Sequence, residues 1–405
     1  MSEAMPDPKD DLIEELHRLA AGKNPGLAGV QDLLERPGLL SLAADLPAPE
    51  LFPMNDVAQA AERLIGDEFD LAEYGVPYLP LKARIVELMA VRGIRCRQEQ
   101  VVLTTGTQAA LDLLGRLLLD PGSQIVVEET VYDGVLTAVR HQEPHILTVS
   151  TDAETGIDVD QVESLLAQGA RPAFLYSIPE GHNPLGVSLS LEKRLRLVDL
   201  ARKFGVPILE DDAYGFLSYD GHPEPPLRAL DESWVVYLGS FSMILAPALR
   251  AGWMVLPDEL APRLSMLPGA AELDVASFSH RTISAWLEAG YLPEHLETVR
   301  AAYRRRRDIL VRALEEHLPK EVRWHRPSSG LFVWVELPPG MDSTALLHTA
   351  VETESVSFAP GSVFAVQGRT HAARGLRLSF GNNPPHRIEE AVHRLARAIQ
   401  SSLPR

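Results

Sequence analysis

Short apolar runs alternate with longer amphipathic helical patterns between about residues 55 and 260. The apolar runs contain no alternating polar positions, which is typical of strands buried on both faces of a sheet. Because a helix separates successive strands, the pattern predicts the α/β class, with a mostly parallel sheet covered by helices on both sides. The predicted strands lie at 101–103, 124–127, 173–176, 206–209 and 234–238.

A second region follows this alternation. A long helical stretch over about 295–317 leads to two further strands, at 331–337 and 376–380. The arginines at 304–307 in this helix are predicted to form a solvated face. Residues 1–40 carry one amphipathic pattern, interpreted as an arm. The predicted division is an arm with part of a small domain at 1–54, a large domain at 55–295 and a small C-terminal domain at 296–405.

Charge and composition narrow the classes of partner. The 405 residues include 38 Lys and Arg against 56 Asp and Glu, a formal net charge of −18, which repels nucleic acid and anionic membranes at long range. No apolar stretch is long enough to span a membrane, and the one cysteine, Cys96, cannot form an internal disulfide. We therefore expect a cytoplasmic protein with no nucleic-acid, membrane or metal partner.

Polar side chains follow three of the predicted strands, where an open parallel sheet binds its ligands. A glycine turn that opens a helix presents backbone N–H groups to an anion, and a guanidinium binds phosphate through two hydrogen bonds. The carboxylates fit either a capped turn or a partner for a cationic ring nitrogen. The residues are Thr107 and Gln108 after the first strand, Glu210, Asp211 and Asp212 after the fourth, and Ser240, Ser242 and Arg250 after the fifth.

The order and spacing of these motifs resemble the class I/II aminotransferases, which are fold type I pyridoxal-phosphate enzymes, and within them the aminoadipate and kynurenine branch. The resemblance extends from residues 42–53 to residues 376–380. It implies a fold type I architecture, with a large domain around a mostly parallel sheet and a smaller α+β domain. It also implies a pyridoxal phosphate cofactor, a small-molecule substrate from amino-acid or specialised metabolism, and a homodimer.

The resemblance also implies roles for individual residues. Asp211 would pair with the pyridine nitrogen, Tyr214 and Asn183 would hydrogen-bond the ring's phenolic oxygen, and Tyr132 would stack on the ring. Arg377 would clamp a substrate α-carboxylate, with Asn183 beside it. The phosphate would be held by Thr107, Gln108, Ser240, Ser242 and Arg250, with Tyr74 reaching it from the other subunit.

The chain departs from the family at its central position. The family pattern Ser-x-Ser-Lys supplies the lysine that forms the Schiff base with the cofactor, and this chain has Met243 there. A thioether has neither a nucleophilic nitrogen nor a titratable proton, so ordinary transamination is not expected. The remaining lysines lie away from the predicted ligand edge: Lys9, Lys23, Lys82, Lys193, Lys203 and Lys320.

Other positions of the substrate site differ as well. The usual Gly-Gly near the substrate carboxylate is Ala44-Asp45, and the Gly-Gly of the small domain is replaced by the Ser328-Ser329-Gly330 sequence. A carboxylate at Asp45 would repel a substrate carboxylate or occupy Arg377 itself. Asp45 is predicted to take part in catalysis, together with Tyr214. It is also predicted to take part in substrate binding.

Three explanations of Met243 remain open. The residue could be an engineered change in an ordinary aminotransferase. Alternatively, the protein could hold pyridoxal or pyridoxamine phosphate noncovalently and perform non-standard chemistry. The fold could also serve cofactor-independent catalysis or a non-catalytic binding role. The altered substrate positions favour natural divergence, and the retained phosphate motifs favour the noncovalent cofactor.

Overall fold

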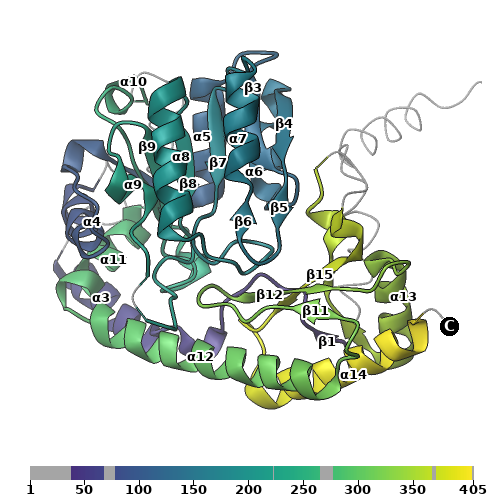
Figure 1. Cartoon of the computed structure of the whole chain (residues 1–405). Coiled ribbons are helices and arrows are strands. Elements are labelled where there is room, and N and C mark those ends of the chain that lie inside the picture. The colour runs from purple at the N-terminus through teal and green to yellow at the C-terminus, as the bar shows by residue number, and fades with distance from the viewer. Residues whose placement is uncertain (1–37, 68–77, 222, 265–276, 367–370, 404–405) are drawn as a thin grey trace, which may run out of the picture.

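A seven-stranded sheet covered by helices forms the larger part of the molecule in a computed structural model of the chain (Figure 1). The structure describes residues 38–67, 78–221, 223–264, 277–366 and 371–403. The strand order is β2-β10-β9-β8-β7-β3-β4. The strands are β2 (Val101–Thr104), β3 (Gln124–Glu128), β4 (His145–Val149), β7 (Phe174–Ser177), β8 (Ile208–Asp211), β9 (Val235–Ser240) and β10 (Gly252–Val255).

The predicted parallel arrangement is confirmed for β4, β3, β7, β8 and β9, and each of the five predicted strands begins within two residues of its expected start. The exception is β10, which runs antiparallel to both β2 and β9. Sequence reasoning missed β4 and β10. Only a three-residue 3-10 helix, Pro247–Leu249, lies between β9 and β10, so β10 does not fit the alternation of strand and long helix.

Helices cover both faces of this sheet because adjacent side chains of its strands point in opposite directions. Val126 packs into a core with α7 and α8, whereas Val127 packs into another with α5 and α6. Both side chains are fully buried, which explains the uninterrupted apolar runs. The helices are α3 (Met54–Asp67), α4 (Leu79–Val91), α5 (Thr107–Leu118), α6 (Asp133–Val139), α7 (Val159–Ala167), α8 (Leu191–Phe204), α9 (Leu227–Leu230), α10 (Ala261–Leu264) and α11 (Ser277–Glu288).

A smaller antiparallel sheet lies beside the large one, in the order β11-β12-β15-β14 (Figure 1). A segment near the start of the described chain joins this part, because β1 (Leu40–Ser41) pairs in parallel with β13 (Val356–Ser357). The other elements are the hairpin β5 (Thr151–Asp152) and β6 (Gly156–Ile157), then β11 (Arg323–Trp324), β12 (Phe332–Glu336), β14 (Ala359–Pro360), β15 (Gly375–Ser379), α12 (Leu292–His317), α13 (Ser343–Glu354) and α14 (Pro385–Ser402). The predicted fold class is confirmed, while the domain boundaries stay a prediction.

The arginines at 304–307 correct one expectation. Helix α12 runs beneath both sheets (Figure 1), and this position buries Arg306 and Arg307. Arg307 pairs with Asp220 and donates a hydrogen bond to the Pro327 carbonyl, and Arg306 pairs with Glu50. The prediction of a solvated face is wrong for these two residues, because a helix that spans two packed layers has less surface in contact with water.

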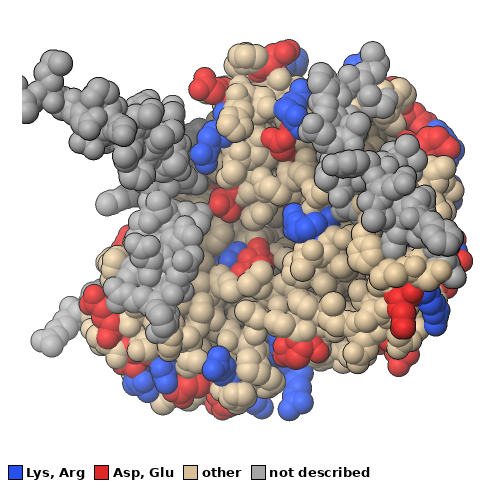
Figure 2. Space-filling model, turned by 180° about the vertical axis from the view of Figure 1, so that it is seen from behind, with Lys and Arg blue, Asp and Glu red and all other residues tan. Residues whose placement is uncertain are grey.

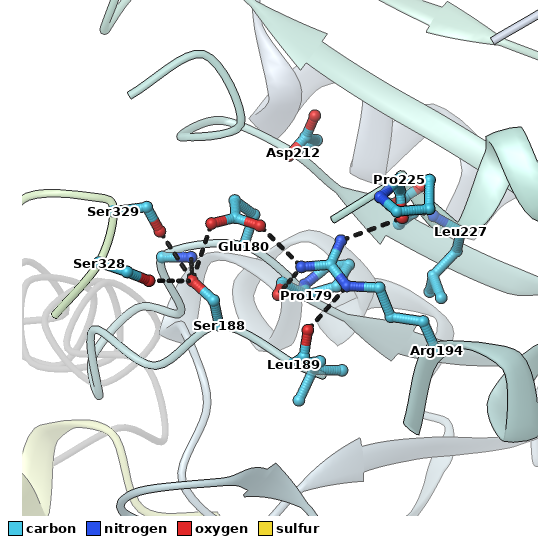
Figure 3. A network of polar contacts seen from close by, with 12 residues as sticks. Pro179, Glu180, Ser188, Leu189, Arg194, Asp212, Pro225, Leu227, Ser328 and Ser329 are labelled. Atoms are coloured by element: carbon cyan, nitrogen blue, oxygen red, sulfur yellow. Dashed lines mark hydrogen bonds and ion pairs between the residues drawn. The ribbon is translucent and has the colours of Figure 1, made fainter. Parts of the chain in front are cut away.

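A buried polar network joins the two parts of the molecule (Figure 3). The Ser188 hydroxyl donates to Glu180 Oε1 over 2.8 Å and lies 2.8 Å from Ser329 Oγ, in the chain that leads to β12. The other carboxylate oxygen of Glu180 pairs with the fully buried Arg194 at 2.7 Å. The network therefore fixes the segment after β7 against the small sheet.

Glycines allow a close backbone approach at the same junction. Gly181 has φ of +60°, and a Cβ there would lie 2.8 Å from Gly330 Cα. Gly330 has φ of +72° and faces Gly181 equally closely. A side chain at either position would force the two backbones apart.

We expect Ser329→Ala to lower the free energy of unfolding by about 1 kcal/mol, because it removes a buried hydroxyl contact and leaves Ser188 one partner fewer. Urea denaturation followed by circular dichroism measures the change. Ser233→Ala, at an exposed serine, is the control and should leave the midpoint unchanged. Equal midpoints for Ser329→Ala and the unaltered protein would show that the hydroxyl pair contributes nothing.

Candidate active site

The carboxyl ends of β2, β8 and β9 meet at one edge of the large sheet. Gly252 in β10 lies opposite both Thr104 at the end of β2 and Ser240 at the end of β9. On the other side of β9, Asp211 lies opposite Leu238. The segments that follow these strands therefore lie side by side, as sequence analysis predicted. Figure 2 shows a hollow near the centre of the face opposite to that of Figure 1, with acidic and basic side chains close together in it.

The predicted phosphate residues gather around the start of α5. Gly106 precedes this helix with φ of +125°, and a Cβ there would lie 3.1 Å from Arg250 Nη2. Arg250 therefore points at the N-terminus of α5, where the first backbone N–H groups have no partner within the helix. The Ser240 hydroxyl accepts a hydrogen bond from the Ser242 N–H over 3.0 Å in the adjacent turn. A guanidinium and a helix N-terminus at one place suit an anion such as phosphate.

The other residues assigned to the phosphate are Gln108 and Thr107, which lie in the first turn of α5, and Tyr74. Gln108 donates from Nε2 to the Gly134 carbonyl over 3.0 Å, which ties the start of α5 to α6. Thr107 is the first residue of α5, beside Gly106. Tyr74, which the resemblance assigns to the phosphate of the other subunit, lies outside the described residues.

Asp211 keeps one carboxylate oxygen without a hydrogen-bond partner in the described part of the chain. Its Oδ2 accepts a hydrogen bond from the Tyr176 hydroxyl over 2.9 Å, while its buried Oδ1 has no such partner. The side chain is 3% exposed, and this burial raises its pKa to about 7. A buried acceptor of this kind fits the N–H of a cationic ring nitrogen.

The neighbouring carboxylates are engaged within the protein. Both oxygens of Glu210 accept hydrogen bonds from the backbone at the start of α9, from the N–H groups of Leu227 and Arg228. Asp212 pairs with Arg92 at 2.9 Å and accepts a hydrogen bond from Tyr237. Of the two interpretations offered by the sequence, the capped turn describes Glu210, and the ring-nitrogen partner suits Asp211.

Asp45 lies among the residues assigned to the ring oxygen and the substrate carboxylate. Its Oδ1 accepts a hydrogen bond from the Tyr214 hydroxyl over 2.9 Å, and its Oδ2 accepts one from Asn183 Nδ2 over 2.8 Å. Arg377 Nη1 lies 3.8 Å from the same Oδ2. The Asp45 side chain is 27% exposed, so this cluster opens towards solvent.

Both terminal nitrogens of Arg377 already have partners. Nη1 donates to Asn183 Oδ1 and Nη2 donates to the Ala43 carbonyl, each over 2.7 Å. The guanidinium also lies over the rings of Phe332 and Phe364, 4.3 Å and 4.9 Å from their centroids. Each terminal nitrogen keeps a second N–H group, and Asp45 Oδ2 lies 3.8 Å from Nη1, so a substrate carboxylate would have to share this guanidinium with Asp45.

Tyr132 lies close to the carboxylates of this site. Burial raises its pKa well above the ordinary value, and the charges of Asp211 and Asp45 raise it further. Burial also raises the pKa of Tyr214, with Asp45 adding to the effect. Both hydroxyls therefore stay protonated at neutral pH, and that of Tyr214 donates to Asp45.

Met243 lies in the turn after β9, half-buried against the main apolar core. The described lysines with printed partners are held elsewhere: Lys193 donates to the backbone of Thr155 and Ile157, and Lys203 pairs with Glu163. Lys82 lies on α4 and Lys320 follows α12, while Lys9 and Lys23 lie outside the described residues.

Sequence reasoning missed two residues of the site. Tyr176 ends a predicted strand, and its hydroxyl on an otherwise apolar run was the available signal. Asp133 begins α6 directly after Tyr132. Burial raises the pKa of Asp133, Arg377 opposes that shift, and Asp45 adds to it, so its carboxyl interacts electrostatically with the same cluster. Nothing in the sequence pattern distinguishes Asp133 from an ordinary acidic residue in the first turn of a helix.

Two searches of the described residues complete the description of the site. Within the ranges that the structure describes, no group of three or more His, Cys, Asp or Glu side chains could hold a metal ion. None of the helices in those ranges combines the length and the apolar character needed to cross a bilayer.

Known proteins with similar sequences and folds include aminotransferases. A family model described as aminotransferase class I and II matches residues 41–395. The 2-aminoadipate transaminase of Thermus thermophilus is 39% identical over 92% of each chain, and aromatic-amino-acid aminotransferase 1 of Thermococcus litoralis is 35% identical over 92% of this chain and 90% of the relative.

Solved structures agree with these relatives. The α-aminoadipate aminotransferase from Thermus thermophilus, complexed with N-(5′-phosphopyridoxyl)-L-leucine, has a TM-score of 0.85 at 37% identity and covers 95% of this chain and 98% of its own. The multiple substrate aminotransferase from Thermococcus profundus has a TM-score of 0.86 at 33% identity, covering 93% of this chain and 94% of its own.

Proposed function

Because the chain belongs to the class I and II aminotransferases, we propose that it binds pyridoxal phosphate noncovalently and acts on an amino-acid-derived substrate by a reaction other than ordinary transamination. The main support is the buried Asp211 oxygen, which has no partner in the described part of the chain although the acid is held in place by Tyr176. A buried polar atom without a partner in the protein suits a ligand that supplies one.

The residues present fit the cofactor at both of its ends. Asp211 would hold the ring nitrogen, and the start of α5 with Arg250 would hold the phosphate. Asn183 would serve the ring oxygen with its second N–H group, since it gives only one to Asp45. Tyr214 has a single O–H, which would have to turn from Asp45 to the ring oxygen. When bound, pyridoxal phosphate acts as an electron sink for bonds broken beside the substrate's amine. The proposed cofactor site would also include Thr107, Gln108, Ser240, Ser242 and Tyr132.

Met243 determines what kind of chemistry this site can support. Its thioether cannot bond to the aldehyde or carry a proton, and the lysines whose contacts are described are engaged away from Asp211. Two groups that can hold or move a proton near the substrate are Tyr214 and Asp45, which share a 2.9 Å hydrogen bond. We therefore assign the proton-handling role to this pair.

A second copy of the chain would complete the site. Large apolar side chains are exposed on three neighbouring helices, with Met54 and Ile65 on α3, Leu79 on α4 and Phe278 on α11. Exposed apolar side chains grouped in this way suit a subunit interface. The proposed assembly is a homodimer in which Tyr74 contributes to the partner's phosphate site. A cytoplasmic location fits a chain with a single cysteine.

We expect the unaltered protein to bind pyridoxal phosphate with a Kd in the micromolar range, about −8 kcal/mol, in calorimetric titration. Borohydride reduction of the complex, followed by mass spectrometry, should leave the mass of the chain unchanged, because no described lysine is placed to react. Pyridoxal without its phosphate is the control and should bind more weakly. Added mass after reduction would contradict the noncovalent mode, and absence of binding would favour the cofactor-independent alternative.

One observation favours that alternative. Asp45 already engages both donors that the cofactor's ring oxygen would use, as the pair of hydrogen bonds from Tyr214 and Asn183 shows. A cofactor-independent enzyme or a binding protein on this fold would keep that arrangement, and the anion site at α5 would then take a phosphorylated or carboxylate ligand. A third reading, an engineered lysine-to-Met243 change, is tested by sequencing the natural gene.

A further inference from the structure

Three charged side chains surround the outer part of the candidate site: Arg377, Asp45 and Asp133. Asp45 lies 3.8 Å from Arg377 and is held in place by hydrogen bonds from Tyr214 and Asn183. Asp133 belongs to the same region, because the nearby Val131 N–H donates to the Phe364 carbonyl over 3.0 Å and the Phe364 ring lies 4.9 Å from the Arg377 guanidinium. Burial and Asp45 oppose its charged form, whereas Arg377 favours it. With all three ionised, one cation faces two carboxylates, and a negative charge is left over.

The binding mode of Arg377 points the same way. A clamp for an α-carboxylate needs two donors directed at the substrate. Here one terminal nitrogen donates to Asn183 and the other to the Ala43 carbonyl, and the guanidinium is 95% buried between aromatic rings. Asp45 supplies the carboxylate on the open side of this arrangement, 27% exposed.

A substrate that brings its own carboxylate would place it beside the Asp45 carboxylate, which already lies 3.8 Å from Arg377. An α-amino acid carries an ammonium and a carboxylate that cancel, so it would leave the excess negative charge in place. A primary amine carries one positive charge, which balances the excess and finds Asp45 as an acceptor. Like charges brought together in a partly desolvated site are costly, whereas opposite charges there attract.

On these grounds, and resting on the proposed function of the same site, we propose that the substrates are primary amines that lack an α-carboxylate, and that Asp45 takes the place which that carboxylate occupies in relatives. Asp45 is then a specificity-determining residue that contacts the amino group of the substrate. Asp133 contributes charge from the start of α6.

Matched pairs that differ only in the carboxylate test this inference without knowledge of the substrate's side chain. The probes are phenethylamine with L-phenylalanine, cadaverine with L-lysine, and isopentylamine with L-leucine. Calorimetric titration into full-length protein saturated with pyridoxal phosphate measures binding rather than turnover. We expect at least one amine to bind, and each amine that binds to do so about tenfold or more tightly than its amino acid.

Variants of Asp45 make the test specific. Asp45→Asn keeps the shape of the side chain but removes its charge, so the preference for the amine should fall at least about tenfold. Asp45→Gly should shift the preference towards the amino acid. Asp199→Asn, at an exposed acid on α8, is the matched control and should keep the preference of the unaltered protein.

The outcomes separate the two levels of the proposal. Amino acids that bind as tightly as their amines, an absence of amine binding, or an unchanged preference in Asp45→Asn would overturn the substrate class while leaving cofactor binding intact. If pyridoxal phosphate itself fails to bind in the first titration, the proposed function and this inference fall together.

Discussion

Met243→Lys is expected to convert noncovalent binding of pyridoxal phosphate into covalent attachment. The new amine would lie at the position where the family pattern Ser-x-Ser-Lys has its Schiff-base lysine, while Asp211 and the start of α5 are unchanged. Attachment should be close to stoichiometric, because a tethered aldehyde and amine react at a high effective concentration. Borohydride reduction and mass spectrometry should show one added cofactor, with a new absorption band before reduction.

The same variant should turn over common amino acids only slowly. Asp45 remains next to Arg377 and still accepts hydrogen bonds from Tyr214 and Asn183, so a substrate carboxylate would still meet a like charge at Arg377. The double variant Met243→Lys with Asp45→Gly is expected to gain about 100-fold or more in kcat/KM over the single one, since it removes a like charge from the carboxylate's place. Stopped-flow or steady-state transamination assays measure both.

A lysine elsewhere in the same loop provides the matched control. Ala248 is exposed five residues further along, so Ala248→Lys adds the same amine without placing it at position 243. It should gain no covalent cofactor after reduction. Rapid transamination by Met243→Lys alone would contradict the divergence inferred from Asp45, and an absence of covalent attachment in that variant would contradict the assigned cofactor site.

Asp211→Asn is expected to change stability and cofactor binding in opposite directions. Removing the buried charge takes away the partner of the ring nitrogen, so the affinity for pyridoxal phosphate should fall about 100-fold. In the cofactor-free protein, the same change removes a carboxylate whose pKa burial raises to about 7. The variant should therefore be more stable than the unaltered protein above about pH 4, where the carboxyl is ionised in the unfolded chain.

The sign of the pH dependence follows from this raised pKa. An aspartate titrates near pH 4 in an unfolded chain, so the unfolded form loses its proton first as the pH rises. Below about pH 4, Asp211 is protonated in both forms and does not lower the free energy of unfolding. Between about pH 4 and pH 7 it lowers that free energy progressively, by no more than about 4 kcal/mol in total. Asp211→Asn should match the unaltered protein near pH 4 and exceed it most at pH 8.

Thermal unfolding of cofactor-free protein at several pH values measures this difference, and Asp199→Asn again provides the exposed control. A stability gap that does not depend on pH would show that Asp211 is not protonated on folding. An unchanged affinity for pyridoxal phosphate would remove Asp211 from the cofactor site, whatever its effect on stability.

The parallel sheet could be predicted because its burial on both faces leaves a direct mark on the sequence, as Val126 and Val127 illustrate. β10 could not, since it follows β9 without an intervening α-helix and runs the other way. Residues such as Asp211 and Arg377 could be proposed one at a time from the resemblance. What each contacts depends on segments far apart in the chain.

Asp45 illustrates this limit. Its neighbour Arg377 could be foreseen in general terms, but its hydrogen bonds to Asn183 and Tyr214 join residues 138 and 169 positions away in sequence. The spare oxygen of Asp211 is a similar case, because it depends on Tyr176 taking only one side of the carboxylate. Such details follow from three-dimensional packing and leave no periodic signal.

The short strand β1 attaches the segment that carries Asp45 to the part of the molecule that contains the small sheet. Leu40 and Ser41 pair with β13, and the Leu42 carbonyl accepts a hydrogen bond from the Ser379 N–H, so the loop that carries Asp45 is anchored next to the strand that carries Arg377. The edge of the large sheet, with Asp211, belongs to another layer. Substitutions in the few residues after β1 could therefore change substrate choice while Asp211 and the start of α5 stay unaltered, and only Tyr214 and Asn183, which donate to Asp45, would have to adapt.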